Sequence, residues 1–142
     1  SSQAWGICPK IAEVDALLSD EPALVHRVKE VHPELLFWAF NAGRAMQHAK
    51  KSRDGAKERA ALIERLEPRA PELIERTLKA HRRTQVGRDD VVDALAAMLT
   101  ADAGETSAWS PAITIPAAPE ADAIGLPMCM WIPAGSIASV QA

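Results

Sequence analysis

The spacing of hydrophobic residues along the chain predicts mainly helices, with one strand early and another late. Pro9 opens a segment with apolar residues at positions 11, 14, 17 and 18, which is the spacing of one buried helical stripe. This helix should end between residues 19 and 22. Residues 24–31 are rich in β-branched side chains and partly alternate, so we expect a strand that ends near Val31.

Prolines and a glycine delimit the next predicted helices. Pro33 opens a short, strongly apolar helix over residues 33–40, because the residue before a proline avoids the helical region, and residues 41–43 close it. Residues 50–83 carry a helical pattern that two prolines interrupt near residues 67–71. We therefore expect two helices in this stretch.

Clustered carboxylates begin the last predicted helix, which spans about residues 89–101. Asp90 and Asp93 are three positions apart and share a face with small alanines, whereas Val92, Leu95 and Leu99 form roughly the opposite face. The pattern predicts that both sides of this helix are buried. Acids at a close-packed surface repel each other, and a divalent cation or a basic partner usually relieves the repulsion.

The rest of the chain has weaker patterns. Residues 103–125 are rich in Ala, Pro, Ser and Gly, which favours a long surface connection. Residues 126–133 have strand character, with Pro127 at an edge or at the strand start, and residues 134–142 form a loose tail. Residues 1–133 should form one domain.

The composition indicates where the protein works more clearly than what it does. The chain has 142 residues, 48% of them hydrophobic, and a formal net charge of -3, so any phosphate-binding surface must be local. Cys8 and Cys129 are far apart and form no metal-binding or redox pair, so we expect two buried thiols in a soluble, cytoplasmic protein. No apolar run is long enough for a membrane span, and no basic start followed by an apolar stretch indicates a signal peptide. The first residues include no initiator Met, which suggests a fragment or a processed chain.

Several segments in order resemble a known family. They are residues 3–7, 10–15, 30–34 with the sequence EVHPE, 37–39, 50–52, 89–96 with the sequence DDVVDALA, and 125–128. Together they are similar to the predicted nucleases of RNase H-like fold that form domain of unknown function family 429. The resemblance covers nearly all of the chain, which matches only the later half of the family's domain. It implies an α/β fold of the ribonuclease H superfamily, here a helix-rich C-terminal portion that lacks the first strands.

The resemblance also implies a site. The last-helix pattern is similar to that of Holliday-junction resolvases, in which it carries the closing acids of a two-metal centre. Glu30, Asp90 and Asp93 would accordingly be the catalytic and metal-binding carboxylates for Mg²⁺ or Mn²⁺, together with an aspartate from the missing first strand. The chain alone should then be nearly inactive, and the missing N-terminal half or a second copy should cover its exposed face.

Structural roles account for several of these residues as well. Asp89 is a further site candidate, but both Asp89 and Asp90 also suit the start of a helix, where carboxylates cap and favour the positive end. His32 is a further site candidate or a turn-capping residue, and Glu34 is a candidate or a partner of its helix dipole. Five basic residues would contact a nucleic-acid backbone or form solvated helix faces, namely Lys50, Lys51, Arg53, Arg82 and Arg83.

Two function classes follow from the sequence. The first is a metal-dependent nuclease that hydrolyses phosphodiester bonds by a two-metal mechanism. The second is a non-catalytic binding or interaction module on the same fold, whose acids serve only as caps and ion-pair partners. An ATP-using relative ranks last, because no Gly-rich phosphate cradle is present.

Overall fold

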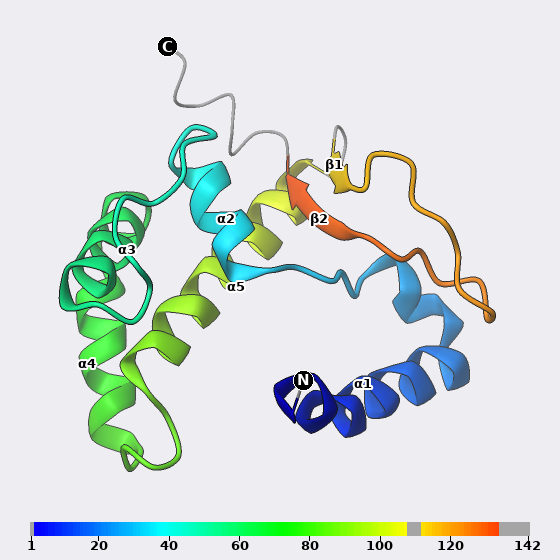
Figure 1. The fold of residues 1–142 in the computed structure, drawn as a ribbon, viewed down its shortest axis with the longest axis horizontal. Helices are drawn as coiled ribbons and strands as arrows, with labels where there is room; N and C mark the ends of the chain where they lie inside the picture. Colours follow the sequence, from blue (N-terminus) through cyan, green and yellow to red (C-terminus); the bar gives the residue numbers. More distant parts are fainter. Residues whose placement is uncertain (1, 108–111, 134–142) are drawn as a thin grey trace.

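The computed structural model describes residues 2–107 and 112–133, and in these ranges the chain is mostly helical, with five α-helices, one 3₁₀ helix and one two-stranded hairpin (Figure 1). In chain order the elements are α1 (Ser2–Asp20), η1 (Pro22–His26), α2 (Pro33–Phe40), α3 (Arg53–Leu66), α4 (Ala70–Ala80), α5 (Arg88–Ser107), β1 (Ala112–Ile115) and β2 (Met130–Pro133). Within the described ranges, no helix has the length and apolar character needed to cross a bilayer.

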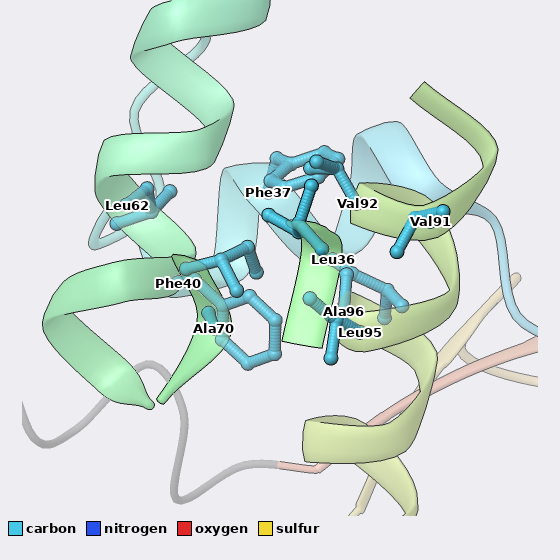
Figure 2. Close-up of a cluster of buried hydrophobic side chains, with 11 residues drawn as sticks. Leu36, Phe37, Phe40, Leu62, Ala70, Val91, Val92, Leu95 and Ala96 are labelled. Atoms are coloured by element: carbon cyan, nitrogen blue, oxygen red, sulfur yellow. The ribbon is translucent and has the colours of Figure 1, made fainter. Parts of the chain in front are cut away.

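Four helices enclose the hydrophobic core. Helix α2 packs against α3 and α5, and α4 packs against both of those helices. Phe37 has no exposed surface and Leu36 is 1% exposed, so the short apolar α2 forms the centre of this packing (Figure 2). The cluster consists of Leu36, Phe37, Phe40, Leu62, Ile63, Ala70, Ile74, Val91, Val92, Leu95 and Ala96. The predicted helix over residues 33–40 and the predicted pair over residues 50–83 are confirmed.

Helix α5 buries one side and exposes part of the other. Val92 and Leu95 are buried in the core and Leu99 packs against it, as the pattern predicts for the larger side chains. On the small-residue side, Ala97 is partly buried against the core but Ala94 and Ala101 are exposed, so the prediction that both sides of the helix are buried holds only in part. The reason is that α2, α3, α4 and β2 all pack on α5 and leave part of this side in solvent.

The hairpin lies against α5 and α2. Strands β1 and β2 are antiparallel, with Ile113 opposite Ile132. Ile132 is fully buried and anchors β2 to the helices. On the other side of β2, the Trp131 N–H donates to the Glu30 carbonyl oxygen at 2.8 Å. The extended segment before α2 therefore runs beside β2 (Figure 1).

The structure differs from the predicted pattern before α2. The strand predicted for residues 24–31 is wrong, because residues 22–26 form η1 and residues 28–32 have no regular structure. Pro22 starts the 3₁₀ helix, in which local bonds replace strand pairing: Leu24 N–H donates to Glu21 O at 2.9 Å and Arg27 N–H donates to Leu24 O at 2.8 Å. This segment therefore forms local turns, although its β-branched residues favour a strand.

The structure also differs towards the C-terminal side. Helix α5 continues to Ser107 and β1 lies at residues 112–115, so the connection predicted for residues 103–125 begins later and contains a strand. The strand predicted over residues 126–133 is shorter and begins at Met130. The tail predicted over residues 134–142 lies outside the described residues.

Helix α1 begins earlier than predicted and stands apart from the core (Figure 1). It starts at Ser2 and contains Pro9 inside, whereas the sequence predicts a start at Pro9. It packs mainly against η1, so its apolar stripe is in solvent: Ile7, Ile11 and Val14 are 54%, 58% and 46% exposed. Cys8 is exposed as well, contrary to expectation.

Cys129 has the opposite environment. Its side chain is buried, as predicted, just before β2. Burial, and then the nearby Glu30 carboxylate, raise the pKa of this thiol. The thiol is therefore a structural group of the hairpin, with little thiolate at neutral pH.

Candidate functional site

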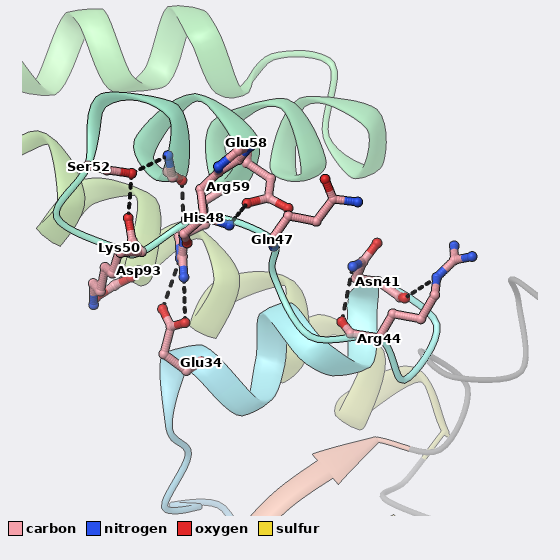
Figure 3. Close-up of polar contacts among 12 residues, drawn as sticks. Glu34, Asn41, Arg44, Gln47, His48, Lys50, Ser52, Glu58, Arg59 and Asp93 are labelled. Atoms are coloured by element: carbon pink, nitrogen blue, oxygen red, sulfur yellow. Dashed lines mark hydrogen bonds and ion pairs between the residues drawn. The ribbon is translucent and has the colours of Figure 1, made fainter.

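An ion pair joins the loop before α3 to the second turn of α5. Lys50 Nζ donates to Asp93 Oδ2 at 2.5 Å, and the two side chains are 35% and 22% exposed (Figure 3). The other oxygen, Asp93 Oδ1, is buried and accepts no hydrogen bond from the described residues. A buried carboxylate oxygen without a donor is unfavourable, so this oxygen is suited to a ligand.

A second ion pair joins a buried arginine of α3 to a partly exposed glutamate at the start of α2. Arg59 is 4% exposed, and its Nε and Nη2 donate to the two oxygens of Glu34 at 2.9 Å and 2.6 Å. Its Nη1 donates to the carbonyl oxygens of His48 at 3.2 Å and Gly55 at 3.0 Å. The Arg59 hydrogen bonds lower the pKa of Glu34, and the same bonds raise the pKa of Arg59. Both groups are therefore charged and fixed in place.

Helix α3 holds the loop that carries Lys50. Ser52 caps the helix by accepting from Gly55 N–H at 2.9 Å, and its hydroxyl donates to the Ala49 carbonyl at 2.8 Å. The Glu58 carboxylate accepts from the backbone N–H groups of Gln47 at 2.8 Å and His48 at 3.0 Å. The irregular loop is thereby fixed, and Lys50 is positioned beside Asp93.

Two hollows adjoin this charged group. The larger has a volume of about 520 Å³ and lies between the start of α2 and residues 45–50. The smaller lies on the α5 side, where Arg88 and Asp89 contribute to its wall. Lys50 and Arg59 line both, so they separate the two hollows.

The structure gives the three predicted metal-binding acids different surroundings. Asp93 pairs with Lys50. Asp90 is exposed, and its Oδ2 accepts from the Gly87 N–H at 2.8 Å, which is a capping interaction at the start of α5. Glu30 is exposed beside β2. No group of three His, Cys, Asp or Glu side chains in the described ranges is close enough to hold a metal ion.

The remaining predicted site residues divide into two groups. His32 and Glu34 both line the larger hollow, with His32 at the N-cap of α2 but with no side-chain capping bond. Asp89 lines the smaller hollow. Of the basic residues, Lys50 pairs with Asp93 and the other four are exposed, namely Lys51, Arg53, Arg82 and Arg83.

Arg59 is not among the predicted site residues, but it is the most buried charge in the described chain. A pattern could have revealed it, because Arg59 precedes Leu62 and Ile63 by three and four positions and therefore lies on the buried stripe of its helix. Trp38 and His48 line the larger hollow and were not among the predicted site residues either. No local pattern distinguishes them, since their placement depends on how the loop folds over α3.

The fold and the site together describe a mostly helical domain whose charged centre lies between α2, α3 and α5. The chain belongs to the family described as protein of unknown function (DUF429), whose model matches residues 1–121. No curated protein and no solved structure matches the chain.

Proposed function

We propose that this chain is part of a divalent-metal-dependent nuclease with an RNase H-like fold, in which Glu30, Asp90 and Asp93 are the acidic site residues. The observation that carries the proposal is Asp93 Oδ1, a buried carboxylate oxygen to which no described residue donates. Capping does not account for Asp93, because it lies inside α5 rather than at its start. Carboxylate oxygens are the ligands that Mg²⁺ and Mn²⁺ prefer.

The described residues alone do not fit a complete metal centre. Within them no three ligating side chains converge, and Lys50 occupies the neighbourhood of Asp93 Oδ2. The proposal therefore requires a further carboxylate from another polypeptide segment, in line with the early aspartate that the family resemblance implies. A bound divalent ion would supply an activated water and neutralise charge on the phosphate.

The chain's own residues would prepare such a site. Lys50 holds the Asp93 carboxylate in one orientation and offsets its charge. Arg59 fixes Glu34 beside this pair, so that its carboxylate does not compete for the ion. Phosphodiester oxygens would then meet the basic side chains around the loop, chiefly Lys50 and its neighbour Lys51.

Exposed apolar surface supports the requirement for another polypeptide. The α1 stripe is in solvent, and Ile113 and Ile115 of β1 are 38% and 41% exposed. In the described ranges β1 also pairs with β2 alone, which leaves one edge open. A missing N-terminal half or a second copy would cover these surfaces.

The test uses the full-length protein and nucleic acid with Mn²⁺. Asp93→Asn should abolish Mn²⁺-dependent cleavage and shift the Tm by no more than about 3 °C, because a partly exposed ion pair contributes only about 1 kcal/mol. Asp102→Asn, an exposed position on the same helix, serves as the matched control and should cleave like the wild type. Equal cleavage by the Asp93 variant would remove this residue from the site.

A non-catalytic binding module is the second candidate, and one observation favours it. Asp90 caps α5 and Asp93 pairs with Lys50, so each acid has a structural partner. Calorimetric titration of the full-length protein with Mn²⁺ separates the two functions. Binding that Lys50→Met strengthens and Asp93→Asn removes supports the nuclease, whereas no detectable binding supports the module.

A further inference from the structure

The larger hollow has walls of two different kinds. One wall is aromatic and apolar, and it includes Trp38, Leu35 and Met46. The rest of the lining, here called the polar wall, includes His32, Gln47, His48 and Lys50. Its volume of about 520 Å³ is in the range of sites that bind small organic ligands.

The aromatic wall is held by the turn that ends α2. Trp38 is half-buried, and its carbonyl accepts from the Gly43 N–H at 2.9 Å. Gly43 has a φ of +71°, and a Cβ there would be in ordinary van der Waals contact with the indole, 3.5 Å from Trp38 Cζ2. The turn therefore packs against one part of the indole ring, and Trp38 also lines the hollow.

The polar wall keeps hydrogen-bonding groups available. Within the described residues, the side chains of His32, Gln47 and His48 form no hydrogen bond. The one carboxylate in the wall, Glu34, has both oxygens bound by Arg59 and so presents little free negative charge. Lys50 also lines the hollow, and its ammonium group has donors beyond the one bound to Asp93, which favours an anionic ligand.

We propose that this hollow binds one unpaired nucleotide of a nucleic-acid strand, with the base on Trp38 and the phosphate towards His32, His48 and Lys50. The inference rests on the proposed function and names its substrate class, because Lys50 joins the hollow to Asp93. Stacking on an aromatic side chain needs an exposed base face, which a base inside a duplex does not offer. Single strands should therefore be preferred over duplexes.

The test is a binding measurement without metal, so that it is independent of catalysis. Fluorescence anisotropy of the full-length protein in EDTA uses a labelled ten-nucleotide single strand, as DNA and as RNA, and the matching duplex. The single strand should bind more tightly than the duplex. Trp38→Leu should weaken single-strand binding about tenfold, the usual effect of losing one stacked base. Trp38→Phe keeps a ring and should retain most of the affinity.

Two controls make the outcome decisive. Trp5→Leu removes a tryptophan that is 80% exposed on α1 and should leave binding unchanged. Asp102→Asn, at an exposed position on α5, should likewise leave binding in EDTA unchanged. Cleavage by Asp93→Asn equal to that of the wild type, with Trp38-dependent binding, would refute only the metal site, whereas Asp93-dependent cleavage with Trp38-independent binding would overturn only the nucleotide site. Equal affinity for the duplex, or no binding of either single strand, also overturns it.

Discussion

Gly55 decides how closely the loop before α3 can approach that helix. A Cβ added at this position would lie 2.1 Å from the Ala49 carbonyl oxygen and 2.8 Å from the carbonyl carbon. Both are backbone atoms, and neither distance is sterically allowed. In Gly55→Ala the loop must therefore move away from α3, and it would take Lys50 with it.

The cost can be worked out from the bonds at this contact. Ala49 O accepts from Ser52 N–H at 2.9 Å and from Ser52 Oγ at 2.8 Å, and the adjacent His48 O accepts from Arg59 at 3.2 Å. Losing three such bonds costs about 3 kcal/mol, since each contributes about 1 kcal/mol. Alanine returns about 1 kcal/mol through its higher helix propensity. The expected net loss of unfolding free energy is about 2 kcal/mol.

Thermal and urea unfolding followed by circular dichroism would measure this loss. For a chain of 142 residues, about 2 kcal/mol corresponds to a Tm lower by about 6 °C. Gly6→Ala is the matched control, because Gly6 also lies within a helix but has no atom within 4 Å of the added Cβ. It should not lower the Tm. A Gly55→Ala protein as stable as the wild type would refute the close approach of loop and helix.

Two further changes test the core and the loop. Phe37→Ala should lower the unfolding free energy by about 3 to 5 kcal/mol in urea, because Phe37 has no exposed surface and leaves a cavity; a loss below about 1 kcal/mol would contradict its central place. The Gln47 N–H, and to a lesser extent the His48 N–H, lower the pKa of Glu58 from its ordinary value of 4.5. The stabilisation from Glu58 is therefore fully present above pH 4.5 and is lost as the pH falls through the lowered pKa. Glu58→Gln should be about 1 kcal/mol less stable than wild type at pH 7. This difference should shrink below pH 4, and a constant difference in urea unfolding would contradict the assignment.

The helices around the core could be predicted because their limits are local. Pro33 fixes the start of α2, and residues 41–43 end it with positive φ at Ala42 and Gly43. The prolines near residues 67–71 likewise separate α3 from α4. In each case the residues that set the boundary are next to the element they delimit.

The strands could not be predicted equally well, because strand pairing depends on distant residues. β1 pairs with β2 fifteen or more positions away, and its own four residues carry little pattern. Residues 24–31 have strand composition, but their first part belongs to the 3₁₀ helix that starts at Pro22. A prediction from composition considers the side chains of one segment but not the strand with which it would pair. It therefore placed a strand at residues 24–31, where none forms.

The candidate site could also be predicted only where local sequence determines it. The position of Asp93 inside its helix was visible in the sequence, and so was its need for a basic partner or a cation. That this partner is Lys50 was not visible, since 43 positions separate the two residues. Arg59 was missed because its run of charged neighbours resembles a solvated face.

The loop before α3 has a further consequence for how this chain can vary. Its backbone is bound at residues 47, 48 and 49 by groups from Ser52, Glu58 and Arg59. An insertion or deletion there would shift the register of these bonds and carry the ammonium group away from α5. Although it lacks regular secondary structure, this stretch should tolerate changes of sequence far better than changes of length.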